Sequence, residues 1–192
     1  MAFDAVKFLH ILSVIFMSAP LYNLIVVNER VLFGKAPFAV DRYFENIIKG
    51  AAIRCYVFQL TALITGLILV PLSELPFSAV LTNPALLLKF ILLIILSALL
   101  SLVHLRIQPA IDALLGRVEG EVIPKEVLEA VTPIRVRRKK LAGLCLFIVI
   151  TIVLLGLQVF ESFAFPVNIL ILALAALFSY RVYRSPVRFG WV

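Results

Sequence analysis

The sequence predicts an all-α integral membrane protein, a single bundle of five transmembrane helices, and three observations lead to this fold class. Hydrophobic residues make up 63% of the 192 residues, and the mean hydropathy is +1.11, whereas about half of a soluble domain is apolar. The apolar residues gather in stretches of about 20, the length that a helix needs to cross a hydrocarbon core of about 30 Å. Most charged residues lie between or at the ends of these stretches.

The apolar stretches leave little room for a separate soluble domain, so we expect one transmembrane domain over residues 1–192. The expected spans are Phe8–Val27, Ala51–Leu72, Ala85–Leu105, Leu141–Val159 and Phe165–Tyr180. A secretory signal is the other interpretation of the first span. Asp4 precedes it together with Lys7, and the apolar run continues past Pro20 without a good cleavage site. We therefore expect a helix that is retained.

The distribution of Lys and Arg predicts which way the chain faces. Four lie in the segment 28–50, eight in 106–140 and three after Tyr180, but none lie in 73–84 or 161–164. Because basic segments stay in the cytoplasm, the N-terminus is expected outside and the C-terminus in the cytoplasm. The loops that contain Glu74 and Glu161 are then outside. This pattern fits a multi-pass protein of the cell (cytoplasmic) membrane.

The net charge of +7 favours anionic lipid over nucleic acid as a partner, because the basic residues flank spans and few aromatic residues alternate with them. The expected headgroup contacts lie in the run before the fourth span: Arg135, Arg137, Arg138, Lys139 and Lys140. The rest of the segment 106–140 is expected to form short interfacial helices, since Pro109 and Pro124 can each open a helix.

Polar side chains inside the spans are the candidate functional residues, because their burial in lipid without a partner is costly. They are His10, Arg54, Gln59, Lys89, His104 and Gln158. With a rise of 1.5 Å per residue, His10 and Lys89 reach the same depth below the outer surface. Arg54 and His104 form a second possible layer near the inner surface. Two histidines a membrane apart cannot bind one haem iron from both sides.

Each candidate also has a plain structural interpretation. Lys89 and Arg54 can extend to the nearer headgroups, His104 can be an interfacial residue, and His10 can be a hydrogen-bonded helix contact. The simplest role of Gln59 and of the serines at positions 97 and 101 is to form hydrogen bonds between helices.

The two cysteines, Cys55 and Cys145, are expected to be buried thiols without a disulfide bond. The sequence contains no phosphate-binding loop, dinucleotide fingerprint or nucleophile elbow, which argues against the chemistry of soluble enzymes.

The stretch KFLHILSVIFMSAPLYNLIVVNER, residues 7–30, resembles the first helix of a group of small bacterial membrane proteins. The group contains the protoporphyrinogen oxidases of the HemJ type, the copper-resistance D-type proteins and a related uncharacterised family. Their first helix opens on an apolar L-H motif, continues with small residues and closes on a basic end. FLHILSV, MSAPLY and NER stand here in that order.

The resemblance covers about the first three helices, and it departs from the HemJ type at 28–30, where that type has a further histidine. It implies that His10 and Lys89, the latter in NPALLLKFILLIIL, bind haem b or a porphyrin near the outer surface. His10 is then the iron ligand, and Lys89 contacts a propionate or supplies a second ligand.

Three functions stay open from the sequence. The first is a haem- or porphyrin-binding protein with a redox role; oxidation of porphyrinogen is the reaction expected if this protein is an enzyme. The second is a non-catalytic subunit or assembly factor that packs against other membrane proteins or against copies of itself. The third is a transporter of a small solute or metal ion, although five helices do not divide into two inverted halves.

Overall fold

The computed structural model describes residues 1–30, 37–159 and 163–184; within these ranges, the side chains of 22–30 and 182–183 are not described. All regular secondary structure in these ranges is helical, so the all-α prediction is confirmed. The elements are α1 (Ala2–Arg30), α2 (Phe38–Leu72), α3 (Ala79–Thr82), α4 (Pro84–Leu102), the π-helix η1 (Val103–Ile107), α5 (Gln108–Leu115), α6 (Lys125–Gln158) and α7 (Phe165–Arg184).

Four helical stretches of the described residues are long and apolar enough to cross a membrane. They are Ala2–Leu21, Phe38–Leu72, Pro84–Leu115 and Lys125–Gln158. The apolar part of α7, Phe165–Arg181, is shorter, so a fifth span there stays a prediction. The helices also extend beyond the predicted spans. With 35 residues, α2 is about 52 Å long, more than a hydrocarbon core of about 30 Å, and part of it must lie outside that core.

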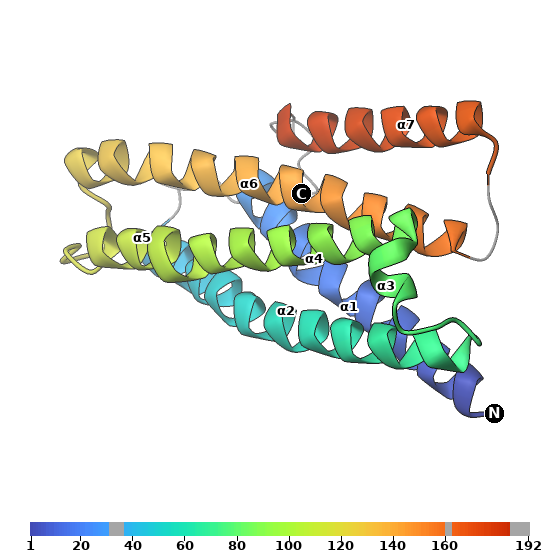
Figure 1. Ribbon diagram of the computed structural model, residues 1–192. Helices are drawn as coiled ribbons and strands as arrows, with labels where there is room; N and C mark the ends of the chain where they lie inside the picture. The colour runs from blue at the N-terminus through green and yellow to red at the C-terminus, as the bar shows by residue number, and fades with distance from the viewer. Residues whose placement is uncertain (31–36, 160–162, 185–192) are drawn as a thin grey trace.

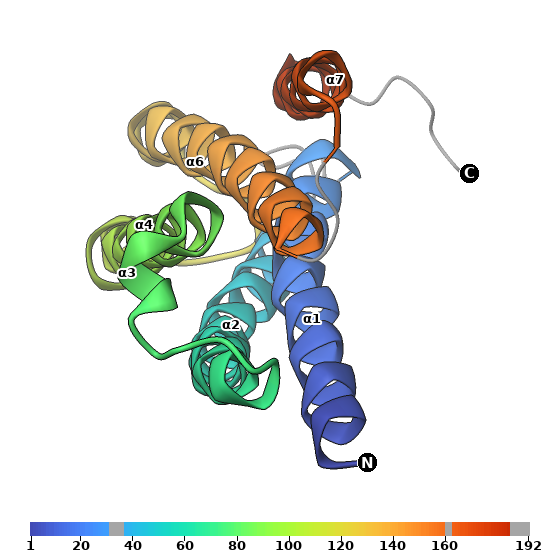
Figure 2. The ribbon, with the colours of Figure 1, turned by 45° about the vertical axis from the view of Figure 1, so that its right-hand side comes forward.

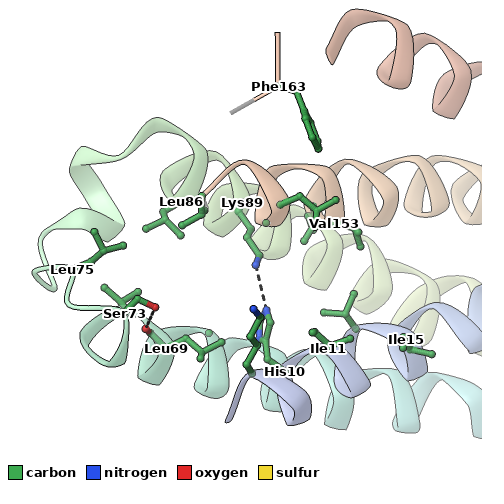
Figure 3. Close-up of a pocket in the computed structure, with 18 residues that line it drawn as sticks. His10, Ile11, Ile15, Leu69, Ser73, Leu75, Leu86, Lys89, Val153 and Phe163 are labelled. Atoms are coloured by element: carbon green, nitrogen blue, oxygen red, sulfur yellow. Dashed lines mark hydrogen bonds between the residues drawn. The ribbon is translucent and has the colours of Figure 1, made fainter. Parts of the chain in front are cut away.

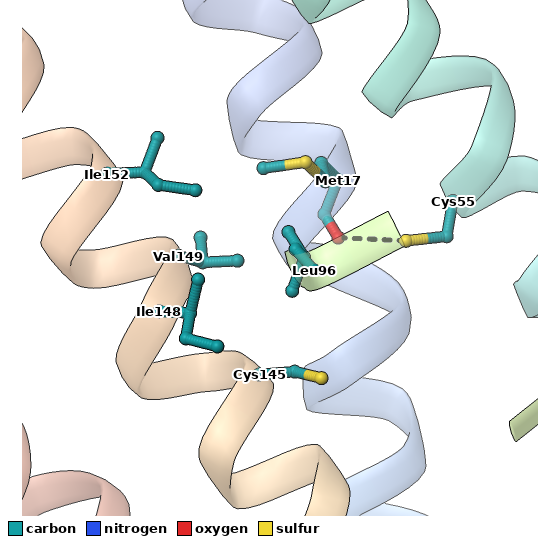
Figure 4. Close-up of a cluster of buried hydrophobic side chains, with 7 residues drawn as sticks. All are labelled: Met17, Cys55, Leu96, Cys145, Ile148, Val149 and Ile152. Carbon is teal, nitrogen blue, oxygen red and sulfur yellow. Dashed lines mark hydrogen bonds between the residues drawn. The ribbon is translucent and has the colours of Figure 1, made fainter. Parts of the chain in front are cut away.

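Helices α1, α2, α4 and α6 pack together, and α7 lies against the outer side of α6 (Figures 1 and 2). Met17, Leu96 and Ile152 form the centre of the core and are 2% exposed or less (Figure 4). Apolar side chains such as Leu60 and Ile64 point outward and are about half exposed. Apolar residues on all sides are typical of helices that face lipid.

The segment 106–140 differs from the short interfacial helices that the sequence predicts. After α4 the chain continues through η1 into α5, and α6 runs without a break from Lys125 to Gln158. Pro109 lies in the first turn of α5, where its missing N–H is tolerated, and the wider π-helical turn precedes it. The helix expected to open at Pro124 does begin there, but it is the fourth membrane-spanning candidate itself.

A buried group of charged and polar side chains joins α2, α5 and α6 at the end of the bundle far from the N-terminus (Figure 1). Arg135 donates from Nε to Glu45 Oε1 (2.9 Å) and from a terminal nitrogen to Asp41 Oδ2 (3.0 Å). Arg138 donates to both carboxylate oxygens of Glu45 (2.5 and 3.0 Å) and to Gln108 Oε1 (2.7 Å). We call these five residues the Arg–Glu cluster.

The Arg–Glu cluster corrects part of the lipid prediction. The side chains of Arg135 and Arg138 are 6% and 0% exposed, so these two guanidinium groups face the interior instead of headgroups. Residues three apart lie on one face of a helix, and this face of α6 packs against the acids of α2. Lipid contact stays a prediction for Arg137, Lys139 and Lys140.

Glu45 precedes the expected span Ala51–Leu72. Burial by itself would raise the pKa of its carboxyl group, but the hydrogen bonds and charges of Arg138 and Arg135 outweigh this effect and lower the pKa below its ordinary value. The Glu45 carboxylate is therefore held in the charged form that the arginines require.

Candidate functional site

The structure brings the two predicted site residues into direct contact at the end of the bundle where α1 begins. Lys89 of α4 and His10 of α1 are hydrogen-bonded, with 3.2 Å between Nζ and Nε2 (Figure 3). The prediction that they share one layer is thus confirmed, and the side chains face each other. That orientation could not be predicted, because helix rotation does not follow from topology.

Thr65 of α2 holds the other side of the imidazole ring. Its Oγ1 lies 3.0 Å from His10 Nδ1 and 2.6 Å from the carbonyl oxygen of Thr61, to which the hydroxyl donates. Since a hydroxyl group carries one hydrogen, it must accept the bond from the ring. This network places the hydrogen of His10 on Nδ1, and Nε2 is the acceptor that faces Lys89.

Two glycines make room for this pair. A Cβ atom on Gly66 of α2 would lie 3.2 Å from His10 Cε1, and one on Gly156 of α6 would lie 3.2 Å from Lys89 Nζ. Both distances are shorter than ordinary van der Waals contact, so the absence of a side chain lets α2 and α6 approach the ring and the ammonium group closely. Four helices therefore position the site.

We expect Gly156→Ala to displace the Lys89 ammonium by a few tenths of an ångström and to perturb its bond to His10. In ¹⁵N spectra of histidine-labelled protein, the Nε2 signal of His10 should shift. Gly50→Ala is the matched control, because no atom lies within 4 Å of a Cβ atom there. It should leave the His10 signals unchanged and, through helix propensity, stabilise the protein by about 0.5–1 kcal/mol. Equal spectra for both variants would contradict the described packing.

A cavity of about 480 Å³ adjoins the pair, and a smaller space of about 70 Å³ shares His10 and Lys89 with it. The larger volume lies in the range of small-molecule sites, roughly 300–1,000 Å³. Its walls come from α1, α2, α4, α6, the segment after α2, and residues between α6 and α7, with Leu86, Val153 and Phe163 among the apolar members (Figure 3). The hydrogen-bonding side chains that line it are Lys7, His10, Ser73 and Lys89.

Among the described residues, the charged side chains that line this cavity are cations. No Asp or Glu is among the described residues that line it, and none of the ion pairs that the structure shows involves Lys89. Burying an ammonium group among apolar side chains is costly unless an anion or strong hydrogen bonds compensate. A neutral imidazole is a weaker partner for it than a carboxylate.

The hydrogen bonds expected between helices are present. Ser97 of α4 donates to Gln59 Oε1 of α2 (2.8 Å), and Tyr56 of α2 donates to Ser101 of α4 (2.8 Å). These bonds confirm the structural interpretation of Gln59 and the serines. Gln158 at the end of α6 donates to Asn168 Oδ1 of α7 (2.7 Å), so it also joins two helices.

The second predicted layer is not formed as a pair. Arg54 is exposed, whereas His104 packs edge-on against the ring of Tyr56, with 6.0 Å between ring centroids. Cys55 and Cys145 are buried free thiols, as predicted.

Of the two contacts expected with haem or a porphyrin, the geometry fits the one between Lys89 and a propionate, but not the one between His10 and iron. Lys89 adjoins the cavity and carries the charge that a propionate would neutralise. His10 Nε2, the nitrogen that would bind iron, accepts the bond from Lys89, so it is available to a metal only after Lys89 turns away. Among the described residues, no group of three or more His, Cys, Asp or Glu side chains is placed to hold a metal ion.

Comparisons of the chain with protein-family models, curated proteins and solved structures gave no match. The function is therefore argued from the site.

Sequence reasoning missed Thr65, Gly66 and Gly156 as parts of the site. Gly66 lies seven residues after Gln59 and therefore on the same face of the helix, which is the available signal for it. The sequence around Gly156 does not mark it as a site residue, because a single glycine in an apolar helix can serve many kinds of packing.

Proposed function

We propose that the protein is a multi-pass membrane protein that binds an amphipathic ligand with an anionic group in the cavity beside His10 and Lys89. Lys89 forms the ion pair with the ligand, and His10 is the second polar contact. The observation that carries this proposal is the ammonium group of Lys89, which lies at an apolar cavity and has no carboxylate partner in the described residues. An anionic ligand supplies the missing charge.

The distribution of basic residues supports a site in the outer half of the membrane. Under this proposal α7 is the fifth span, the N-terminus is outside and the C-terminus is cytoplasmic. The Arg–Glu cluster then lies at the cytoplasmic side. A ligand reaches the cavity from the outer leaflet or from the aqueous phase outside.

A porphyrin is the ligand class that the resemblance favours, and the cavity is compatible with it in chemistry: an apolar wall for the ring and a cation for a carboxylate. In this proposal Lys89 contacts a propionate while His10 keeps its bond to Thr65. When haem b is bound, its iron supplies redox chemistry, and His10 Nε2 is the candidate ligand in a state in which Lys89 has released it.

The test is a titration of the purified protein, in mild detergent, with protoporphyrin and separately with haem. We expect a saturable shift of the Soret band with protoporphyrin, and competition by naphthalene-2-sulfonate, an apolar anion that is not a porphyrin. Direct binding of naphthalene-2-sulfonate, measured by calorimetry, without a Soret shift of protoporphyrin would keep the anion site and exclude the porphyrin. If neither compound binds, the proposal is wrong.

The same spectra test the role of His10. After reduction with dithionite, sharp α and β bands of haem that vanish in His10→Gln would identify His10 as an iron ligand. Haem spectra that are the same in wild type and His10→Gln would restrict His10 to a polar contact.

A further inference from the structure

His10 presents its titratable nitrogen to the cavity. Thr65 donates its hydrogen to the backbone and therefore accepts the Nδ1–H bond, so Nδ1 keeps its hydrogen in either charge state of the ring. A proton can be gained or lost only at Nε2, and Nε2 is the atom that accepts from Lys89 at 3.2 Å. Ligand, ammonium group and titratable nitrogen therefore meet at one place.

The charged groups that line the cavity around His10 are all cations in the described residues. Lys7 lies on α1, one turn before His10, and Lys89 lies on α4. Both α2 and α6 contribute only glycine and aliphatic side chains to the cavity, and the segment after α2 contributes Ser73, which is uncharged. Before a ligand binds, a second proton on the ring would put an imidazolium next to an ammonium group, which is unfavourable.

Resting on the function proposed above, we propose that the site binds a metal-free anion together with one proton, which His10 takes up at Nε2. The anion draws the ammonium group of Lys89 to itself and so breaks the bond from Nζ to Nε2. A proton from the aqueous phase then forms the new N–H bond at Nε2. No covalent bond of the ligand changes, and the site gains one negative and one positive charge, so its net charge is the same before and after.

The coupling has a defined direction. An anion beside Lys89 and His10 favours the protonated ring, and by thermodynamic reciprocity protonation of the ring favours the anion. The affinity for an anion that stays ionised should therefore increase as the pH falls, by at most about tenfold per pH unit for one coupled proton. A protein that co-transports an anion with a proton requires this coupling. A protein that releases an acid when the pH changes requires it too.

The experiment uses the full-length protein and naphthalene-2-sulfonate, whose head stays ionised throughout. Binding is measured by calorimetry between pH 8 and pH 5.5, in pairs of buffers with different ionisation enthalpies, which gives the number of protons taken up per sulfonate. For wild type we expect uptake that approaches one proton and an affinity that increases toward low pH. His10→Gln should bind more weakly, with a flat pH profile and no proton uptake. His104→Gln removes the other histidine and should behave as wild type.

The outcomes separate this inference from the proposed function. Sulfonate binding that depends on Lys89 but is independent of pH, without proton uptake, overturns the inference and leaves the proposed function intact. Undiminished proton uptake in His10→Gln also overturns it. Failure of wild type to bind sulfonate at any pH contradicts the proposed function, and the inference falls with it.

Discussion

Glu45→Gln is expected to destabilise the folded protein by about 3–5 kcal/mol, because it removes the carboxylate that compensates the buried guanidinium group of Arg138 and one of the carboxylates that Arg135 binds. Glu45 receives bonds from both Arg135 and Arg138, whose side chains are almost fully buried. The free energy of unfolding is measured in mixed micelles by titration with a denaturing detergent. The effect is large because an unpaired buried charge costs far more than the pair contributes.

Two controls identify the cause of that loss. Glu129→Gln removes a carboxylate from an exposed ion pair with Lys125 on α6 (3.8 Å). It should change the free energy of unfolding little, since exposed ion pairs contribute little to stability. The double variant Glu45→Gln/Arg138→Met should lose less than the sum of the single variants, as expected for residues in one network. Equal losses for Glu45→Gln and Glu129→Gln would show that the cluster is not buried as described.

The pH dependence of stability follows from the same group. Because the pKa of the Glu45 carboxyl is lowered in the folded state, its contribution is complete above its ordinary pKa of about 4.3. The contribution is lost as the pH falls through the lower, folded-state pKa. In Glu45→Gln this acid-dependent part of the unfolding free energy should be absent.

Lys89→Met is expected to weaken the binding of naphthalene-2-sulfonate roughly 10- to 100-fold, the loss that corresponds to one charge-assisted hydrogen bond of about 1.5–3 kcal/mol. Methionine keeps the length and apolar character of the side chain but removes the ammonium group. It also removes an uncompensated charge from the bundle, so the protein should be at least as stable as wild type. A gain in stability together with a loss of binding is typical of a residue that serves function.

The control for Lys89→Met is Lys49→Met, which removes a cation at the opposite end of α2. Lys49 pairs with Asp112 at 2.9 Å and is 55% exposed. Its loss should leave sulfonate affinity unchanged, because Lys49 is exposed and far along α2 from the site, so that salt screens its charge. A similar loss of affinity in both variants would mean that net charge attracts the sulfonate and that Lys89 is not its contact.

The shared depth of His10 and Lys89 could be predicted because it depends on helix rise and chain direction alone. Their contact depends on how α1 and α4 are rotated, which apolar residues on every side of both helices do not reveal. The close approach of Gly156 to Lys89 is likewise a property of packing between α4 and α6 and has no signature in the sequence of either.

The Arg–Glu cluster was missed for a different reason. Arg135 and Arg138 stand in a run of basic residues, and such a run is typical of a membrane surface. Their spacing of three, matched by the spacing of four between Asp41 and Glu45, was the available signal. The continuous α6 could also not be recognised, because Pro133 lies inside it and a proline usually ends or bends a helix.

On the structure described above, Lys89 makes this cavity a site for anions. The measurement that tests it most directly compares the dissociation constants of naphthalene-2-sulfonate and naphthalene-2-sulfonamide, an uncharged compound of nearly the same shape, for wild type and Lys89→Met at one pH. We expect wild type to prefer the anion roughly tenfold or more, and Lys89→Met to lose this preference while it keeps the affinity for the sulfonamide. A preference of the same size in both proteins, or no preference in wild type, would contradict it.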